Sequence, residues 1–448
     1  MSEIVSLAGV IIAIVFMMYS IYKGLSLPIA AIISTVFIAV TSGIGIDALW
    51  DTCVDSAVVP VFKTYVGLWL FGGIMGYVYG ESGASASMAF FLFGPLKKIR
   101  NPKTKIFAYL AMFMIMRVIL GLTGIDSMAV MVLVLAIIIA FFKELDIPRK
   151  YISCVMVCGI SAGGMLPYAP CAMNVIIPMF IPQWSASSHG GLRMIWTVAF
   201  IVLASLWLAK MVMKDQKNGE HFEMGRMQNV RVDESDPNRP HWALTFIPII
   251  VVIVLYNFVH CSAWLSTAGG ALASIILFAR HLDLKDPTPQ GRGKFAMFVE
   301  NMNTSSMIIP LYLCLNGIMA GAITNAPAYN LIIRLCENIV TVTGPVVGYI
   351  IVSVVLVVMG NSAVFVGANL ANTVFAAAGL DLVTAGTIML AGNTVLNTLP
   401  NSAEMQVQAQ LSDTPLKIGY PPIFKTTVLL TFVLMVLISI PITLGISF

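Results

Sequence analysis

Two long apolar segments are interrupted by the polar, glycine- and proline-containing runs GGMLPYAPCAMN at residues 163–174 and AGNTVLNTLPNS at residues 391–402. Two further apolar segments break at GLTGIDS, residues 121–127, and at GNSAVFVGAN, residues 360–369. Unpaired backbone groups and amide side chains are costly in hydrocarbon, so such breaks survive at membrane depth only where protein buries them or a water-filled cavity receives them. Because each half of the chain holds two breaks, the pattern is typical of the binding site of a secondary transporter.

The composition of the 448-residue chain points to a membrane protein, since 58% of its residues are hydrophobic and only 10% are charged. A soluble domain carries about 25% charged residues. The net charge of +4 arises largely from lysine and arginine in loops, which membrane topology explains better than nucleic-acid binding. We therefore expect a protein embedded in the lipid bilayer, with no nucleic-acid partner.

Apolar stretches long enough to cross a bilayer, about 20 residues each, recur along the chain. We expect spans near residues 4–22, 25–44, 57–80, 150–182, 193–213, 243–260, 262–280, 297–322, 381–411 and 422–446. The stretches 106–142 and 343–378 each contain a break near the middle, which leaves two short arms. They predict re-entrant helical hairpins with the polar break at the tip, and two short spans are the alternative that hydropathy leaves open.

Lysine and arginine cluster at residues 97–105, at 143–150 and around the central loop 214–242. Such loops stay on the cytoplasmic side, so both ends of the first hairpin should be cytoplasmic. The first half then crosses the membrane an odd number of times, and the second half begins on the opposite side.

The predicted fold is an all-α, polytopic, inverted-topology repeat of about five plus five transmembrane helices, with two re-entrant hairpins and broken helices. The first repeat would cover residues 1–213 and the second residues 243–448, joined by a cytoplasmic linker at 214–242. We expect a multi-pass protein of the plasma membrane, specifically of a bacterial inner membrane.

The polar residues of the breaks are candidates to bind a small organic anion. Helix N-termini at the hairpin tips leave backbone N–H groups that can hold a carboxylate, and hydroxyl and amide side chains can add donors. The candidate substrate-binding residues are Thr123, Ser127, Asn174, Asn361, Ser362, Asn369, Asn393, Asn397 and Asn401. The alternative is that these side chains only cap helix ends or join helices.

A coupling cation is expected at the same breaks. Pro167, Pro170 and Pro400 remove backbone donors and stop continuous helix, which should leave carbonyl oxygens free for a cation. Asp126, in the first hairpin tip, and Glu404 could take up a proton. A simple proline kink without a ligand and a structural pair between Asp126 and Arg117 are the alternatives.

Other classes of function find less support in the sequence. Cys154 and Cys158 lie one helical turn apart, but no histidine or second cysteine pair completes a metal site near them, so no metal is expected. The five histidines lie in loops or at span ends, so no Ser–His pair at membrane depth indicates an intramembrane hydrolase. We expect no catalytic residues and no cofactor; a passive anion channel is a further alternative.

Residues 121–135, with the acid Asp126 just before an apolar arm, and the run GGMLPYAP at 163–170 resemble the gluconate permease family of organic-anion and proton symporters, within the ion transporter superfamily. The family's proline-rich break includes a histidine where this chain has Tyr168 and Ala169, and its acid is glutamate where this chain has Asp126. The asparagine-rich second half also resembles the Ser-Asn-Thr clusters of sodium-coupled dicarboxylate carriers.

The resemblance implies a symporter that carries a hydroxy acid or sugar acid such as gluconate together with protons. Sodium is the alternative coupling ion, and a sodium-coupled di- or tricarboxylate carrier is the alternative function. The resemblance further implies a homodimer in which a transport domain moves against a scaffold.

Overall fold

The computed structural model describes residues 2–123, 131–223, 238–282, 300, 317–360, 373–376, 379–400, 402, 405, 408, 412 and 414–446. The structure is 80% helix, and these residues contain no strand, which confirms the all-α prediction. Among the described residues, six helices are long and apolar enough to cross a membrane. The protein is therefore a helical protein embedded in a membrane.

The described part of the first half contains ten α-helices and two irregular turns of helix, a π-helical one (η1) and a 3-10 one (η2). They are α1 (Glu3–Tyr22), α2 (Leu27–Ser42), α3 (Ile46–Cys53), η1 (Val54–Val58), α4 (Val59–Glu81), α5 (Ala84–Phe93), η2 (Gly94–Lys98), α6 (Pro102–Gly121), α7 (Met131–Leu145), α8 (Tyr151–Gly164), α9 (Ala172–Phe180) and α10 (Gly190–Lys217).

The described part of the second half begins with the 3-10 turn η3 and ends with a long helix that contains the π-helical segment η5. Its elements are η3 (Trp242–Phe246), α11 (Ile247–Asn257), α12 (Ala263–Phe278), η4 (Ala279–His281), α14 (Ala328–Gly360), α16 (Leu382–Leu396), α18 (Leu416–Ile423), η5 (Phe424–Leu429) and α19 (Leu430–Thr443).

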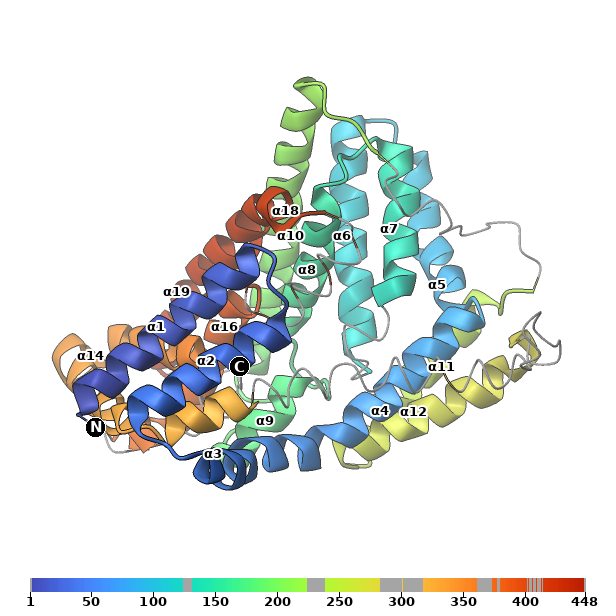
Figure 1. Ribbon diagram of the computed structural model, residues 1–448. Helices are drawn as coiled ribbons and strands as arrows, with labels where there is room; N and C mark the ends of the chain where they lie inside the picture. The colour runs from blue at the N-terminus through green and yellow to red at the C-terminus, as the bar shows by residue number, and fades with distance from the viewer. Residues whose placement is uncertain are drawn as a thin grey trace.

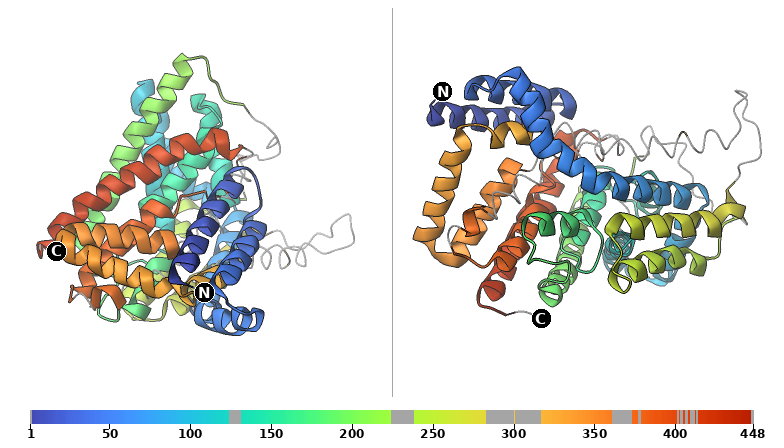
Figure 2. Two further views of the ribbon diagram at one scale, coloured as in Figure 1. Left: turned by 60° about the vertical axis from the view of Figure 1, so that its left-hand side comes forward. Right: turned by 90° about the horizontal axis from the view of Figure 1, so that it is seen from below.

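Helices of the two halves pack against one another. The first-half helix α4 lies along the second-half helix α12, and α1 packs against α14. Figures 1 and 2 show α4 and α12 side by side at one flank and α1 beside α2 at another, with α6, α8, α10, α16 and α19 between them. An ion pair between Arg334 of α14 and Glu3 of α1 also joins the halves.

The basic segments gather at one end of the bundle. Lys105, near the start of α6, lies 2.7 Å from Glu144, near the end of α7. Lys150, just before α8, lies 2.7 Å from Asp215, near the end of α10. The side chain of Gln216 also donates to the carbonyl oxygen of Leu145 at 2.9 Å, so the ends of α7 and α10 meet at this basic end.

α8 and α16 start at opposite ends of α10, a continuous helix of 28 residues that is about 42 Å long. Lys150 and Tyr151, where α8 begins, both contact Asp215 near the C-terminus of α10. In the second turn of α16, Thr387 lies 2.9 Å from Nδ1 of His189, the residue that precedes α10. The two helices therefore enter the bundle from opposite sides.

Several element boundaries differ from the sequence prediction. α10 runs from Gly190 to Lys217, so it extends at both ends beyond the predicted span. α14, in contrast, consists of two helices that meet at Gly344, one residue after the predicted start of the second hairpin. Gly344 has a φ of 75° and Pro345 follows it, because glycine tolerates this conformation and proline suits the first turn of a helix. The hairpin tips 124–130 and 361–372, and most of the predicted span 297–322, lie outside the described residues.

Candidate functional site

The first helix break is the loop 165–171 between α8 and α9. Asn174, in the first turn of α9, folds its side chain back over this loop. Its Nδ2 donates to the carbonyl oxygens of Leu166 at 3.0 Å and of Ala169 at 2.8 Å. The side-chain amide thus satisfies backbone groups that the break removed from the helix.

Arg193 of α10 holds the same loop from the other side. Its side chain is fully buried, and its Nη2 donates to Asn174 Oδ1 at 2.6 Å and to the carbonyl oxygen of Leu166 at 3.0 Å. Its Nε donates to the carbonyl oxygen of Met165 at 3.1 Å. Arg193 and Asn174 therefore form one hydrogen-bonded unit with the first break.

The remaining contacts of Arg193 lie in the loop that leads from α9 to α10. Nη1 donates to the carbonyl oxygens of Ala186 at 2.7 Å and Ser188 at 3.4 Å. The guanidinium carbon lies 5.2 Å from the ring centre of Trp184, within the range of a cation–π interaction.

This geometry differs from the expectation that Pro167 and Pro170 leave free carbonyl oxygens. Both prolines are buried and the helix does stop around them, but side chains of the protein donate to the carbonyl oxygens of Met165, Leu166, Tyr168 and Ala169. A buried carbonyl without a partner is costly, and Arg193 has five N–H groups in a rigid fork to offer. Asn174 is thus fully engaged with its own chain, and its predicted role in substrate binding stays a prediction.

The sequence prediction missed Arg193. Placing the span at residues 193–213 puts this residue at the membrane edge, where an arginine needs no internal partner. A signal was present, because Arg193 is the only charged residue between positions 190 and 209 of an otherwise apolar helix.

The start of α16 docks on the loop before α10. Nε1 of Trp184 donates to Thr387 Oγ1 at 2.9 Å, and a Cβ atom on Gly386 would come within 2.7 Å of the Trp184 ring. His189 reaches the same hydroxyl. Burial lowers the pKa of His189 below its ordinary value of 6.5, and Arg193 lowers it further, against the opposing effect of Asp381. The neutral imidazole is therefore favoured at this contact.

The end of α8 meets the last turn of α16. A Cβ atom on Gly164, the last residue of α8, would lie 2.5 Å from Cγ2 of Thr394. A Cβ atom on the nearby Gly392 would lie 3.7 Å from Cβ of Ser353 on α14. The C-terminal ends of two helices that enter from opposite sides thus meet inside the bundle.

Several buried polar atoms near this meeting point have no hydrogen-bond partner in the structure. Among the described side chains they include Oδ1 of Asn393 and the hydroxyls of Ser161 and Ser353. Asn393 is only 7% exposed. A buried polar atom without a partner costs about 1–3 kcal/mol, which makes these atoms candidates to meet a ligand or an ion.

The second helix break follows Leu396. Thr398 in this break accepts a hydrogen bond at 3.0 Å from the hydroxyl of Thr427. Thr427 lies in η5, and π-helical segments occur frequently at functional sites. The adjacent Thr426 contacts the sulfur atoms of Cys154 and Cys158 on α8 at 3.3 and 3.4 Å, so these two cysteines pack against the final helix.

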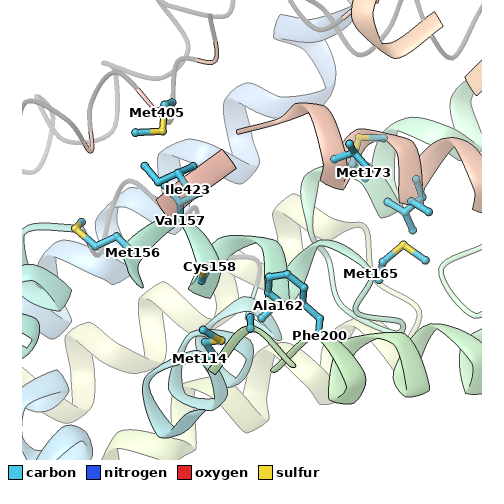
Figure 3. Close-up of a cluster of buried hydrophobic side chains, with 14 of the residues drawn as sticks. Met114, Met156, Val157, Cys158, Ala162, Met165, Met173, Phe200, Met405 and Ile423 are labelled. Carbon is cyan, nitrogen blue, oxygen red and sulfur yellow. The ribbon is translucent and has the colours of Figure 1, made fainter. Parts of the chain in front are cut away.

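Figure 3 shows the apolar surroundings of α8, with Val157, Cys158 and Ala162 near Met114, Phe200 and Ile423. Met165 and Met173, which flank the first break, are also buried. The first break is thus embedded in packed hydrocarbon rather than in a broad polar surface.

The other predicted site residues fall into two groups. Thr123 is buried just after α6, and its hydroxyl donates to the carbonyl oxygen of Leu120 at 2.5 Å. Asn397 directly follows α16, and its backbone N–H donates to the carbonyl oxygen of Asn393 at 2.8 Å. Pro400 is half-buried. The predicted residues that lie outside the described part of the chain are Asp126, Ser127, Asn361, Ser362, Asn369, Asn401 and Glu404. Within the described residues, no three His, Cys, Asp or Glu side chains gather closely enough to hold a metal ion.

The chain matches no family model in a scan of protein families and no curated protein in a sequence search.

Proposed function

We propose that this protein is a secondary active transporter that carries a small organic carboxylate, a hydroxy acid or sugar acid, together with protons or sodium ions. The observation that supports it most is the contact between Gly164 of α8 and Thr394 of α16. Two helices that enter from opposite ends of the bundle stop where they meet, which is the arrangement of a transporter with its site near the membrane midplane.

The helix ends at this point suit charged ligands. The C-terminal end of a helix carries about half a negative charge, and its last carbonyl groups lack intrahelical partners. The ends of α8 and α16 would favour a cation, whereas a helix N-terminus such as that of α9 would favour the carboxylate.

An inverted repeat is supported by matching packing in the two halves. α6 and α10 pack on α8 in the first half, as α14 and α19 pack on α16 in the second. A second pair of contacts matches across the halves. α5 of the first half packs on η3, which leads into α11 at the start of the second half, and α14 of the second half packs on α1 at the start of the first. These contacts in one half therefore have counterparts in the other.

A first re-entrant hairpin is supported by the contact between Lys105 and Glu144, which brings the start of α6 and the end of α7 to the same end of the bundle. That end is rich in lysine and arginine, so we place it in the cytoplasm. The homodimer and the bacterial inner membrane remain expectations that follow from the family resemblance and the topology.

Sodium coupling is favoured by the oxygen atoms that lie near the end of α16. Asn393 and Ser353 offer oxygen atoms without partners among the described residues, and hard cations prefer oxygen ligands. Neither side chain titrates near neutral pH. Proton coupling would instead need an acid such as Asp126.

Uptake into sealed proteoliposomes tests the proposal. The purified protein should accumulate a radiolabelled hydroxy acid or sugar acid against its gradient when a sodium or pH gradient is imposed, and a screen of carboxylates under both gradients would identify the substrate and the ion. Unlabelled substrate on the far side should accelerate exchange, because a carrier shows counterflow and a channel does not. Folded protein that moves no organic anion under either gradient would contradict the proposal.

A further inference from the structure

The two helix breaks differ in the polar atoms beside them. At the first break, Asn174 and Arg193 donate to the carbonyl oxygens of Met165, Leu166 and Ala169. At the second break, Oδ1 of Asn393 is buried and has no partner among the described residues. Groups of the protein itself therefore hold the carbonyl oxygens of the first break, whereas a buried acceptor without a described partner lies one turn before the second.

Arg193 lies where a bound cation would lie. Met165 and Leu166 directly follow the last residue of α8, and carbonyl groups at the end of a half-helix are the ligands that coordinate a cation in broken-helix transporters. Here the guanidinium group donates to both of these carbonyl oxygens, at 3.1 and 3.0 Å. The positive charge also opposes the negative end of the helix dipole of α8.

The surroundings of Arg193 hold this charge permanently. A fully buried charge is costly unless hydrogen bonds or an opposite charge compensate it. Its described side-chain hydrogen bonds go to four backbone carbonyls and to Asn174 Oδ1, and its guanidinium faces the ring of Trp184. An arginine stays protonated at every physiological pH, so a charge in this position neither titrates nor exchanges with solvent.

We propose that Arg193 is a tethered cation that occupies the first break, so that an exchangeable coupling cation binds only at the second break, beside Asn393. Asn174 is then a positioning residue that aligns the loop 165–171 with the guanidinium. The assignment of the exchangeable cation to the second break rests on the transport function proposed above, whereas the role of Arg193 at the first break does not.

Replacement of Arg193 tests the tethered charge by thermal unfolding of the purified protein in detergent. Arg193→Ala should lower the unfolding midpoint by several degrees, and methylguanidinium or sodium, at ionic strength held constant with choline, should restore a large part of that loss. Neither ion should stabilise the first break of the wild-type protein, so the wild type should gain less than the variant. Lys210→Ala, which removes an exposed positive charge from the same helix, should show no such rescue.

The opposite results overturn the role of Arg193. An Arg193→Ala variant that folds, loses stability and gains no more from either ion than the wild type would show that the side chain only fills space. If Arg193→Ala fails to fold, Arg193→Lys decides the question, since it keeps the charge. It should fold and retain the cation dependence of the wild type, and a new requirement for added cation in this variant would contradict the proposal.

A matched pair of asparagine variants tests which break exchanges its cation. Asn393→Ala should raise, several-fold, the concentration of coupling ion that gives half-maximal uptake, with little change in the unfolding midpoint. Asn174→Ala should lower the unfolding midpoint, because it removes three hydrogen bonds, and leave that concentration within about twofold of the wild type. Equal effects of the two variants on ion dependence would overturn the assignment. If the wild type transports no carboxylate, the proposed function fails, and the thermal rescue of Arg193→Ala still decides the role of the arginine.

Discussion

Gly164 at the end of α8 lies directly against Thr394 in the last turn of α16, so that a methyl group on Gly164 would meet Cγ2 of Thr394 at 2.5 Å. These residues are far apart in the sequence and belong to helices that start at opposite ends of α10. Their contact fixes the distance between the two helix ends on which the proposed site depends.

Gly164→Ala should therefore force α8 and α16 apart. Overpacking of this kind costs about 1–3 kcal/mol, and we expect a lower unfolding midpoint together with reduced uptake. Gly163→Ala is the matched control, because a Cβ atom at Gly163 meets nothing within 4 Å.

The second-site change Thr394→Ser should rescue Gly164→Ala. Serine lacks the Cγ2 atom that causes the clash, and it keeps the hydroxyl that donates to the carbonyl oxygen of Ala391 at 2.6 Å. If the double variant is as impaired as Gly164→Ala alone, the helix ends are not in the contact described.

Trp184→Phe should loosen the docking of α16 on the loop before α10. The change removes the indole donor of the 2.9 Å hydrogen bond to Thr387 and part of the ring that Arg193 faces. We expect a loss of about 1–3 kcal/mol in the free energy of unfolding. Trp50→Phe, at an exposed position, serves as the control and should change the stability little.

Acidification should weaken the same contact through His189. Its pKa in the folded protein lies below the ordinary value of 6.5, so in the pH range just below that value the unfolded chain binds a proton that the folded protein does not. The contribution of neutral His189 to the free energy of unfolding is then fully present above about pH 6.5 and decreases as the pH falls below that value.

The difference between unfolding midpoints at about pH 7.5 and about pH 5.5 measures this effect. It should be smaller in His189→Gln, which cannot titrate, than in the wild type. The same pH dependence in both proteins would show that other groups cause it.

The two ends of α10 should label from opposite sides of the membrane. Ser187, before α10, and Lys217, at its end, are both exposed, and each can be replaced by cysteine in a background without the seven native cysteines. A membrane-impermeant maleimide should reach Lys217→Cys only from the cytoplasmic side and Ser187→Cys only from outside. Labelling of both from one side would contradict the topology.

The sequence predicts the positions of the two described helix breaks, after α8 and after α16, because their causes are local. Glycine and proline end α8 near Gly164 and Pro167 wherever the rest of the chain lies. The hydropathy that predicts the long apolar helices is also a local property of the sequence. It nevertheless places the start of α10 three residues late, at 193 rather than at Gly190.

The sequence could not show which polar groups of the breaks are already satisfied. Whether Asn174 meets a ligand or its own backbone depends on how the chain folds back, and Arg193 lies 19 residues further along. The contact between Trp184 and Thr387 spans 203 residues, and no periodicity or motif encodes such a pairing. Tertiary geometry alone distinguishes the closed first break from the second.

The most direct test of the proposed function is ion-driven uptake of a labelled hydroxy acid or sugar acid into proteoliposomes that contain the wild-type protein, Gly163→Ala or Gly164→Ala. The wild type and Gly163→Ala should concentrate the acid inside the vesicles under a sodium or pH gradient and show counterflow, and Gly164→Ala should do so markedly less. Absence of organic-acid uptake by folded wild-type protein under both gradients, or uptake that is unaffected by Gly164→Ala, would contradict a transport site where α8 and α16 meet.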